Sequence, residues 1–302
     1  MYDRNEKMKK FTILIPVYND WQSVFKLLKE IDFQVSKWNA DVSILIMNDG
    51  STEARPTNEF ILKNLKLIRI VNMKKNQGHA RSIATGLKFL FEREKFDHVI
   101  IMDGDGEDRP EELNLLFKKS SESPNKVITA NRIKRSEGLL FKFLYECHKM
   151  ITFVFTGRLV KFGNYSCLPR DAVSVLLKDA SFWSSYSGSV VKIIKDRDHV
   201  PSIRGKRFVG PSKMNLVKLV VHSIAIMAVF KNSAIIRSAL FLFFYLFFVF
   251  DNLSFITLFP VFVIALFQIL IFKISSRESM EGLNHSLTNV GSIDVLTHLT
   301  SE

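Results

Sequence analysis

The segment DHVIIMDGDGEDRPEEL, residues 97–113, decides how the fold of this chain is interpreted. Its apolar run 99–102 predicts a buried strand that ends directly on two carboxylates, Asp103 and Asp105. Residues two positions apart on an extended chain point to the same side, so both carboxylates can face one ligand, while Gly104 lets the backbone approach it closely. Carboxylate oxygens suit Mg²⁺ or Mn²⁺. An isolated Asp-Gly-Asp is more often a solvated turn, but in this context the segment predicts a site for a divalent cation and the diphosphate that it carries.

Short β-branched runs alternate with helical stretches from residue 11 to about residue 130. This alternation predicts an α/β fold of Rossmann-like type, in which a mostly parallel sheet carries helices on both faces and the crossovers are right-handed. Ligands of such sheets bind outside the carboxyl ends of the strands. The expected strands are residues 11–17, 42–48, 65–72, 98–103 and 126–130, and the expected helices are residues 22–31, 57–65, 80–91 and 110–119.

A polar turn follows each of the first four expected strands. The turns cover residues 16–19, 48–51, 76–78 and 103–105. Because the carboxyl ends of neighbouring parallel strands meet at one edge of a sheet, we expect these turns to converge. Their convergence indicates a nucleotide-binding crevice.

Composition and charge indicate contact with lipid and with anions. The chain has 302 residues, of which 47% are hydrophobic, and its net charge is +12. Such a charge suits nucleic acid, an anionic membrane surface or phosphorylated substrates. We do not expect nucleic acid as a partner, because the basic residues cluster beside apolar segments and no nucleic-acid-binding motif is present. The two cysteines, Cys147 and Cys167, are too few for a disulfide framework, and His79 and His148 lack the spacing of metal ligands.

Two apolar segments near the C-terminus predict a transmembrane hairpin. Residues 253–272 contain no charge and are long enough to span a bilayer, and residues 234–250 are apolar except for Arg237 and Ser238. Asp251 and Asn252 form a polar turn between them. Basic residues flank both outer ends, and the positive-inside rule therefore puts those ends in the cytoplasm. The apolar run near the N-terminus is too short for a signal peptide, which agrees with a cytoplasmic catalytic domain.

These features divide the chain into four parts. We expect a cytoplasmic catalytic domain over residues 1–213 and a transmembrane hairpin over residues 233–273. Residues 214–232 carry an apolar helical stripe that predicts an interfacial amphipathic helix, although an ordinary core helix would show the same pattern. Residues 274–302 are polar with little periodicity, and we expect a loosely ordered cytoplasmic tail.

Taken together, the polar turns resemble those of glycosyltransferase family 2, and most closely its polyprenyl-phosphate branch, typified by dolichol-phosphate mannose synthase. The residues that carry the resemblance are 15–19, 48–52, 76–78 with Ala80 and Arg81, 102–105 and 110–111. The resemblance covers about residues 11 to 230. It implies a GT-A fold, a nucleotide-diphosphate sugar as donor, and a divalent cation, Mg²⁺ or Mn²⁺, as cofactor.

The resemblance also implies roles for individual residues. Asp103 and Asp105 belong to the DxD motif, and Asp105 is the expected direct metal ligand. Glu107 joins these two in the metal shell, where the branch usually has a neutral ligand. The residues implied for the nucleotide sugar are Pro16, Tyr18, Asn19, Asp49, Gly50, Gln77, Gly78, Arg81, Asp103 and Gly104.

A second element resembles the Arg-x-x-Gly-x-Ser-Lys segment with which this family grips phosphates. It contains Arg204, Arg207, Gly210, Ser212 and Lys213. The resemblance implies that Asp105, Arg204, Arg207 and Lys213 are the catalytic residues. Residues 163–170 resemble the segment beneath the acceptor, and the absence of a Gln-x-x-Arg-Trp motif speaks against a processive polysaccharide synthase.

The expected reaction is an inverting transfer in which negative charge builds on the departing diphosphate. An alcohol acceptor needs a general base, yet the stretch between Asp179 and Asp196 contains no carboxylate. A lipid phosphate is already ionised, so a membrane polyprenyl phosphate is the preferred acceptor. The alternatives are transfer to a hydroxyl of a lipid-linked saccharide in surface-polysaccharide assembly, and a catalytically silent membrane-anchored binding protein.

Overall fold

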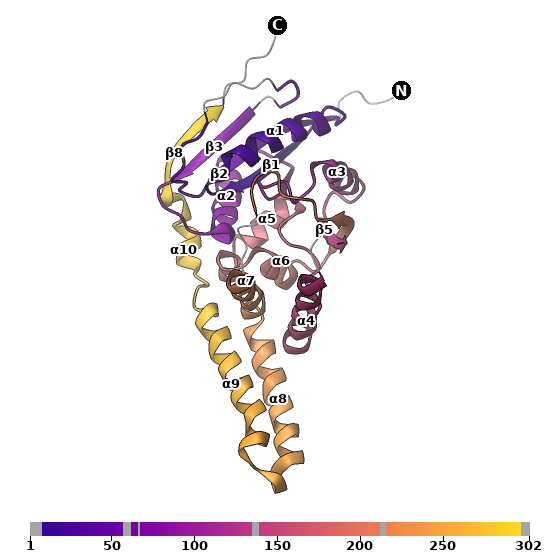
Figure 1. Ribbon diagram of the computed structural model, residues 1–302. Helices are drawn as coiled ribbons and strands as arrows, with labels where there is room; N and C mark the ends of the chain where they lie inside the picture. The colour runs from indigo at the N-terminus through magenta and orange to yellow at the C-terminus, as the bar shows by residue number, and fades with distance from the viewer. Residues whose placement is uncertain (1–7, 57–61, 66, 135–138, 212–215, 297–302) are drawn as a thin grey trace.

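The computed structural model describes residues 8–56, 62–65, 67–134, 139–211 and 216–296, and its centre is an eight-stranded mixed sheet (Figure 1). The strands are β1 (Lys9–Val17), β2 (Ala40–Asn48), β3 (Leu67–Met73), β4 (His98–Ile101), β5 (Val127–Lys134), β6 (Ser166–Pro169), β7 (Arg197–Ile203) and β8 (Val290–Leu296). Their order across the sheet is β7-β5-β6-β4-β1-β2-β3-β8. Strands β4, β1, β2 and β3 run parallel, whereas β6 and β8 are antiparallel to their neighbours.

Helices connect the strands and cover both faces of the sheet. They are α1 (Trp21–Val35), α2 (His79–Arg93), α3 (Leu113–Glu122), α4 (Leu139–Thr156), α5 (Arg170–Leu176), α6 (Tyr186–Ile193), α7 (Leu216–Ala228), α8 (Lys231–Val249), α9 (Phe255–Ser275) and α10 (Met280–Asn284). Short 3₁₀ segments are η1 (Pro110–Glu112), η2 (Ala180–Trp183), η3 (Phe250–Asn252) and η4 (Ser286–Asn289).

The central strands are apolar on both sides because each side faces a separate hydrophobic core. Along β1, Ile13 and Ile15 pack with α1, whereas Leu14 between them packs with α2. All four residues of β4 are buried. Helix α1 completes one core with a stripe of apolar residues three or four positions apart. Parallel strands buried on both faces therefore account for the continuous apolar runs of the sequence.

The expected strands agree with β1 to β5 within a few residues, and the predicted α/β class is confirmed. The expected helix over residues 57–65 is not: residues 57–61 lie outside the described residues, and residues 62–65 form no helix. The other expected helices correspond to α1, α2 and α3 with its preceding η1 turn.

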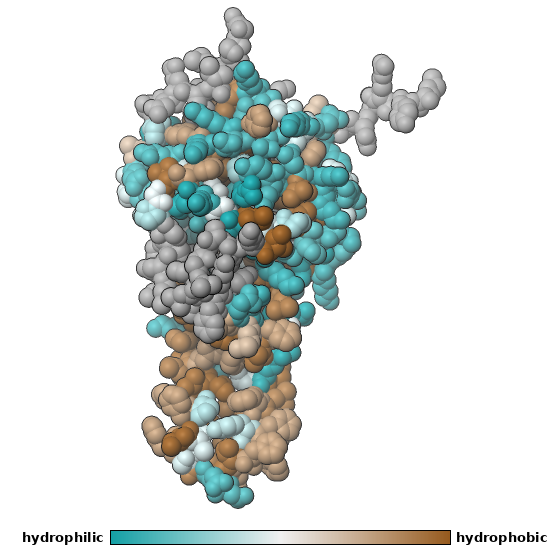
Figure 2. Space-filling view, turned by 45° about the vertical axis from the view of Figure 1, so that its right-hand side comes forward, coloured by the Kyte–Doolittle hydropathy of each residue, from teal (hydrophilic) through white to brown (hydrophobic). Residues whose placement is uncertain are grey.

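Helices α8 and α9 pack side by side below the sheet domain as a hairpin that is long and apolar enough to cross a membrane (Figure 1). Ser254 begins α9 with a capping box to Thr257, and Gln268 donates to Ser238 across the hairpin at 2.6 Å. Most phenylalanines of the two helices are exposed, which gives the brown surface of this region in Figure 2. Helix α7 buries Ile224, Met227 and other apolar side chains against α9.

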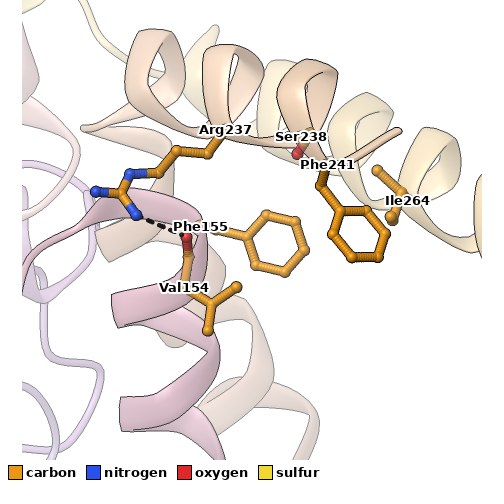
Figure 3. A pocket seen from close by; sticks show the side chains of 6 residues that line it. All are labelled: Val154, Phe155, Arg237, Ser238, Phe241 and Ile264. Atoms are coloured by element: carbon orange, nitrogen blue, oxygen red, sulfur yellow. Dashed lines mark hydrogen bonds between the residues drawn. The ribbon is translucent and has the colours of Figure 1, made fainter. Parts of the chain in front are cut away.

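Arg237, which interrupts the first apolar helix, lies beside the end of α4 (Figure 3). Its guanidinium donates to the backbone oxygen of Val154 at 3.3 Å, and a cation there complements the negative end of the α4 dipole. Next to it, apolar side chains of α4, α8 and α9, among them Phe155 and Phe241, line a cavity of about 130 Å³. The charge is therefore accommodated by the neighbouring helix.

The expectation of a loosely ordered tail over residues 274–302 is wrong for the part that the structure describes. Residues 280–284 form α10, and β8 then pairs antiparallel with β3 at the edge of the sheet. The strand is hard to detect in the sequence because an edge strand lies mostly in solvent, and it interleaves polar residues with exposed Ile293 and Val295.

Candidate functional site

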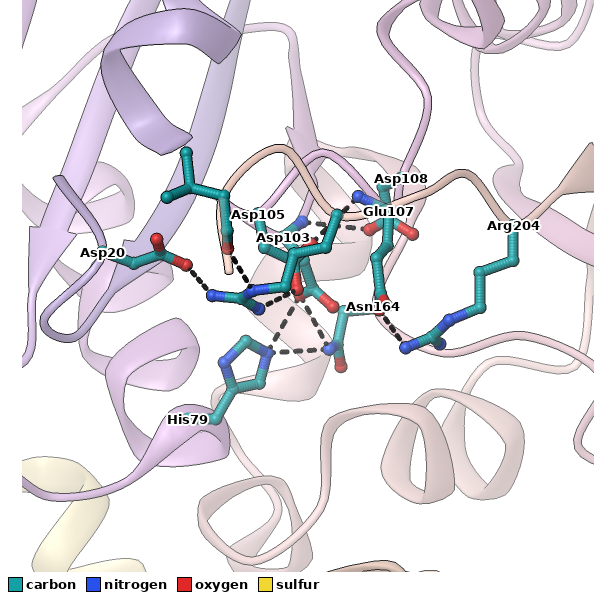
Figure 4. Close-up of polar contacts among 10 residues, drawn as sticks. Asp20, His79, Asp103, Asp105, Glu107, Asp108, Asn164 and Arg204 are labelled. Carbon is teal, nitrogen blue, oxygen red and sulfur yellow. Dashed lines mark hydrogen bonds and ion pairs between the residues drawn. The ribbon is translucent and has the colours of Figure 1, made fainter. Parts of the chain in front are cut away.

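Residues 103–108, here called the acidic loop, follow β4 at the centre of the sheet. The loop lies close to β1 and α1 because residue 104 is glycine: a Cβ there would meet Val24 at 3.0 Å and the backbone oxygen of Pro16 at 3.3 Å. The acidic loop presents Asp103, Asp105 and Glu107 at the edge where β1 to β4 end, together with buried Asp108 (Figure 4).

Asp103 is held by neutral and cationic partners from distant segments. Its Oδ1 accepts a hydrogen bond from Asn164 Nδ2 at 3.1 Å and lies 3.1 Å from His79 Nε2 at the start of α2. Burial opposes ionisation of this carboxyl, but His79, Asn164 and Arg132 outweigh it and lower its pKa. Although loss of solvation lowers the pKa of His79, the negative charge of Asp103 outweighs it, and the net effect raises the pKa of His79.

Asp108, at the end of the acidic loop, hydrogen-bonds back to its first residue. Its Oδ2 accepts the backbone N–H of Asp103 at 3.0 Å. Burial raises the pKa of Asp108 to about 7, and the charge of Asp103 adds to this shift. The side chain is almost fully buried, so we interpret Asp108 as a residue that shapes the acidic loop.

Residues 203–209, here called the basic strap, cross the acidic loop. The backbone N–H groups of Gly205 and Phe208 donate to the carbonyls of Glu107 and Asp105 at 2.8 and 2.9 Å. The Phe208 ring lies over residue 106, where any side chain would collide with the ring. The basic strap is therefore fixed to the acidic loop by its backbone as well as by its side chains.

Asp105 and Glu107 of the acidic loop are each paired with an arginine of the basic strap (Figure 4). Arg207 donates to Asp105 Oδ2 at 2.9 Å and also to Asp20, at the start of α1. Arg204 pairs with Glu107. Burial raises the pKa of Asp105 and of Glu107, while the arginines oppose this shift. Arg204 and Arg207 thus lie among the carboxylates of Asp20, Asp105 and Glu107. Such a mixture of basic and acidic side chains is the charge pattern of a site that binds phosphate together with a cation.

Asp49 organises the adjacent edge, where β2 and β3 end. Its carboxylate accepts the backbone N–H groups of Gln77 at 2.8 Å and Gly78 at 2.9 Å, although burial raises its pKa. Gly50 has φ +67°, and a Cβ there would lie 2.7 Å from the backbone nitrogen of Asn76. Only glycine fits this close approach. Asp49 therefore ties the β2 turn to the turn before α2.

Asn19 ties the end of β1 to the same β2 turn. Its side-chain oxygen accepts the N–H groups of Thr52 and Glu53 at 2.8 and 3.1 Å, and its backbone N–H donates to Ser51 at 2.9 Å. Tyr18 beside it is 45% exposed, so its ring is available to a ligand. Most of the predicted nucleotide-binding residues thus lie on connected turns along one edge of the sheet, and Pro16 lies at the end of β1 beside them. The residues on the turns are Tyr18, Asn19, Asp49, Gly50, Gln77 and Gly78.

Two predicted residues are not brought to the acidic loop by the described structure: Arg81 lies elsewhere, and Lys213 is not described. Arg81 lies over the Trp183 ring of η2, 5.3 Å from its centroid, and burial, with a smaller contribution from the charge of Arg277, lowers the pKa of Arg81. Lys213 lies outside the described residues, as does Ser212. The remaining predicted catalytic residues, Asp105, Arg204 and Arg207, are brought together.

The donor atoms of Asp103, Asp105 and Glu107 suit a hard divalent cation, because all of them are carboxylate oxygens. Asp105 and Glu107 are also adjacent, since Asp105 Oδ1 accepts the Glu107 N–H at 3.0 Å. Within the described part of the chain, no three His, Cys, Asp or Glu side chains are grouped at metal-binding spacing. The residues therefore fit a cation in their chemistry, and a cation would compete with Arg204 and Arg207 for them.

Sequence reasoning did not identify several polar residues of this site. They are Asp20, which pairs with Arg207 of the basic strap; His79 and Asn164, which contact Asp103; Arg132, whose charge lowers the pKa of Asp103; and Asp108 within the acidic loop itself. His79 directly follows the predicted Gln77-Gly78 turn, and Asp108 lies inside the decisive segment, so proximity in sequence was a usable signal for these two. Asn164 lies in the stretch 163–170 that resembles the segment beneath the acceptor, but its contact with Asp103 was not predicted; for Arg132 on β5 no local signal existed.

The carboxylates that flank the region expected to supply a general base are engaged elsewhere. Asp179 caps η2 and pairs with Lys192 at 3.0 Å. Asp196 pairs with Lys126, and Asp198 pairs with Lys119, each at 3.0 Å. The region from Asp179 to Asp198 thus contains no carboxylate without a basic partner.

Comparison with known proteins agrees with this fold. An undecaprenyl-phosphate 4-deoxy-4-formamido-L-arabinose transferase of Klebsiella pneumoniae is 26% identical over 220 residues, which are 70% of this chain and 65% of that enzyme. The chain therefore spans less than two thirds of that relative. An enzyme of the same name from Erwinia tasmaniensis is 24% identical over 222 residues, which are 71% of this chain and 66% of that enzyme.

Solved structures share the architecture at low sequence identity. Glucosyl-3-phosphoglycerate synthase from Mycobacterium tuberculosis, in complex with Mn²⁺, UDP and glucosyl-3-phosphoglycerate, superposes with a TM-score of 0.50 at 12% identity over 75% of this chain and 80% of that chain. Mannosyl-3-phosphoglycerate synthase from Rubrobacter xylanophilus gives a TM-score of 0.51 at 12% identity, over 73% and 72% of the two chains. The predicted GT-A fold is confirmed.

The family itself is shown by the sequence match. Residues 12–180, more than half of the chain, match the model of glycosyl transferase family 2. This stretch contains the acidic loop and the turns of Asn19, Asp49 and Gln77. The chain belongs to glycosyl transferase family 2.

Proposed function

We propose that the protein transfers a sugar from a nucleotide-diphosphate sugar to a membrane polyprenyl phosphate, with inversion at the anomeric carbon. The observation that carries the proposal is the acidic loop, which presents three carboxylates at the carboxyl edge of the sheet beneath two arginines. Family membership and the names of the undecaprenyl-phosphate transferases among its relatives support it. The apolar hairpin supports a lipid acceptor.

In this proposal the turns around Asp49 take the nucleoside of the donor. Asn19 and Asp49 hold the turns in place through backbone hydrogen bonds, and Tyr18 offers an exposed ring against which a base can pack. Gln77 and Gly78 border the same turn. Gly104 keeps the acidic loop close to β1, which leaves its carboxylates facing the diphosphate.

The acidic loop would hold a divalent cation, Mg²⁺ or Mn²⁺, through Asp105 and Glu107, with Asp103 beside them. Such a cation neutralises charge on the departing diphosphate. Arg204 and Arg207 neutralise the same carboxylates in the present structure, and next to the diphosphate their guanidinium groups are bidentate phosphate donors. Lys213, which lies outside the described residues, would add a further cation. Asp103 keeps its charge through His79 and Asn164.

A phosphate acceptor suits the chemistry available around the site. Asp179, Asp196 and Asp198 are already paired with lysines, so none of them is an evident general base for an alcohol. A phosphate monoester is ionised at neutral pH and attacks without one. Basic side chains near the hairpin would attract its headgroup.

The membrane arrangement follows from the same reasoning. The hairpin α8–α9 would cross the bilayer with both outer ends on the side of the sheet domain, and the flanking Lys231, Lys273 and Arg277 make that side the cytoplasm. Helix α7, before the hairpin, would lie at the membrane surface. The protein would then be a multi-pass membrane enzyme whose catalytic domain is cytoplasmic.

The test is a transfer assay with the full chain in lipid nanodiscs. Radiolabelled nucleotide sugars are offered with purified polyprenyl phosphate, or with a lipid-linked saccharide, in the presence of Mg²⁺ or Mn²⁺. We expect a labelled lipid product on bare polyprenyl phosphate, and a rate that falls about 100- to 1000-fold in Asp105→Asn, since one preorganised charged contact is lost. Product only on the lipid-linked saccharide would favour the hydroxyl-acceptor alternative. Absence of any product with every donor would favour a silent binding protein.

A further inference from the structure

Strand β8 connects the apolar hairpin to the edge of the sheet where the donor is proposed to bind. After α9 the chain runs back along the sheet domain through α10 and η4 and then pairs with β3 (Figure 1). In this pairing Asn72 lies opposite Ser292, and Met73 lies opposite Val290. The end of β3 that leads into the Gln77 turn therefore has the C-terminal segment as its neighbour.

The side chain of Asp294 starts a series of hydrogen bonds that reaches the β2 turn. Asp294 Oδ2 accepts from Asn72 Nδ2 at 3.1 Å and from Arg55 Nη1 at 2.9 Å. Asn72 Oδ1 accepts from Asn48 Nδ2 at 2.9 Å, and Asn48 Oδ1 accepts the backbone N–H of Ser51 at 3.0 Å. Asp294 is thus linked to the turn directly through Arg55 and indirectly through two asparagines.

A second set of contacts fixes the loop that follows β3. The backbone N–H of Lys74 donates to the carbonyl of Asn289 at 2.7 Å, and Asn289 Nδ2 donates to the carbonyl of Lys75 at 3.1 Å. Gly50 packs against this same loop. A Cβ added at Gly50 would lie 2.7 Å from the backbone nitrogen of Asn76. The C-terminal segment therefore holds both loops that enclose Asp49.

These contacts exceed what covering a sheet edge requires. Backbone pairing alone would protect β3 from other strands. The ion pair of Asp294 with Arg55 is about one-third exposed on each side, and such pairs contribute little to stability. Their geometric effect is larger. Asn72 Nδ2 donates both to Asp294 and to Ser292 Oγ of β8, the latter at 3.0 Å, and this fixes the amide that in turn orients Asn48 toward Ser51.

We infer that β8 contributes to the donor site. Asp294 is a positioning residue that holds residues 48–56 in the conformation that binds the nucleoside of the donor. The inference rests on the proposed function, since it assigns the turns around Asp49 to the nucleotide. It gives the segment after the membrane hairpin a role in donor affinity. Acceptor use should depend on it much less.

The experiment compares Asp294→Ala and Asp294→Asn with Val295→Thr in the full chain in nanodiscs. Val295 is the matched control because it lies on the same strand, its side chain is exposed, and threonine keeps the β-branched shape. Calorimetry measures the Kd of UDP, GDP, CDP and dTDP with Mn²⁺, thermal unfolding without ligand measures stability, and hydrogen exchange follows the amides of residues 48–56 and 74–78.

We expect Asp294→Ala to weaken nucleotide binding roughly 5- to 30-fold, to speed exchange in both segments and to leave the KM for polyprenyl phosphate unchanged. Asp294→Asn, which keeps an acceptor for Asn72, should recover part of the affinity, and Val295→Thr should match the unchanged protein. If Asp294→Ala fails to fold, Arg55→Ala carries the same test. Unchanged affinity and exchange in these variants, even with a lower Tm, would overturn the inference. Faster exchange in a protein that binds none of the four nucleotides would instead refute the proposed function and leave the role of β8 standing.

Discussion

Replacing Asp49 with asparagine tests how much the Asp49 carboxylate contributes to the stability of the turns that border the site. The carboxylate accepts two backbone N–H groups, from Gln77 and Gly78, and asparagine has the same shape but only one acceptor atom. One charge-assisted hydrogen bond is lost, worth about 1.5 to 3 kcal/mol, and one buried N–H is left facing an amide nitrogen. Burial raises the pKa of Asp49, so removing the charge recovers part of this cost. We therefore expect a net loss of about 1 to 3 kcal/mol.

Thermal unfolding in nanodiscs measures this loss. At roughly 2 to 4 °C per kcal/mol for a domain of this size, Asp49→Asn should lower the Tm by about 2 to 12 °C. The matched control is Asp97→Asn, because Asp97 accepts a single backbone N–H, that of Lys10 at 2.7 Å, and is exposed. Its Tm should move by less than about 2 °C. Equal Tm shifts for both variants, together with unchanged nucleotide affinity in Asp49→Asn, would show that the Asp49 carboxylate does not hold these two turns together.

Three further predictions concern packing, reactivity and the cofactor. Gly50→Ala should lower the free energy of unfolding by about 2 to 5 kcal/mol, because alanine is strained at φ +67° and its Cβ collides with the backbone of Asn76. A Tm equal to that of the unchanged protein would contradict this. Ellman's reagent at pH 8 should modify at most one thiol per native chain, because Cys167 is buried and its pKa is raised to about 12, whereas Cys147 is partly exposed; two thiols should react after denaturation. EDTA should abolish sugar transfer and Mn²⁺ or Mg²⁺ should restore it, so full activity in EDTA would exclude the proposed cation.

The central half of the sheet was predictable because its signals lie within single short segments of the sequence. Strands β1, β2 and β4 are buried on both faces, which produces continuous apolar runs, and each ends in a polar turn that the sequence displays directly. The positions of Asp103, Asp49 and Asn19 at one edge then follow from parallel topology alone.

The rest depended on contacts between segments far apart in the chain. Strand β6 has only four residues, β7 contains Pro201, and β8 is an edge strand, so none of them shows a clear alternation. The pairing of Arg204 with Glu107 joins residues 97 positions apart. No local pattern shows that a basic segment near the hairpin folds back over the acidic loop. The contact of Asp103 with Asn164 has the same long-range origin.

Cation-dependent nucleotide binding shows whether the acidic loop binds the diphosphate of the donor through a cation. The measurement is the Kd of the best-binding nucleoside diphosphate, with Mn²⁺ and with EDTA, for the unchanged protein and for Asp105→Asn. We predict binding that requires Mn²⁺ and weakens by about tenfold or more in Asp105→Asn. Equal affinity in the two proteins, with or without Mn²⁺, would contradict the account.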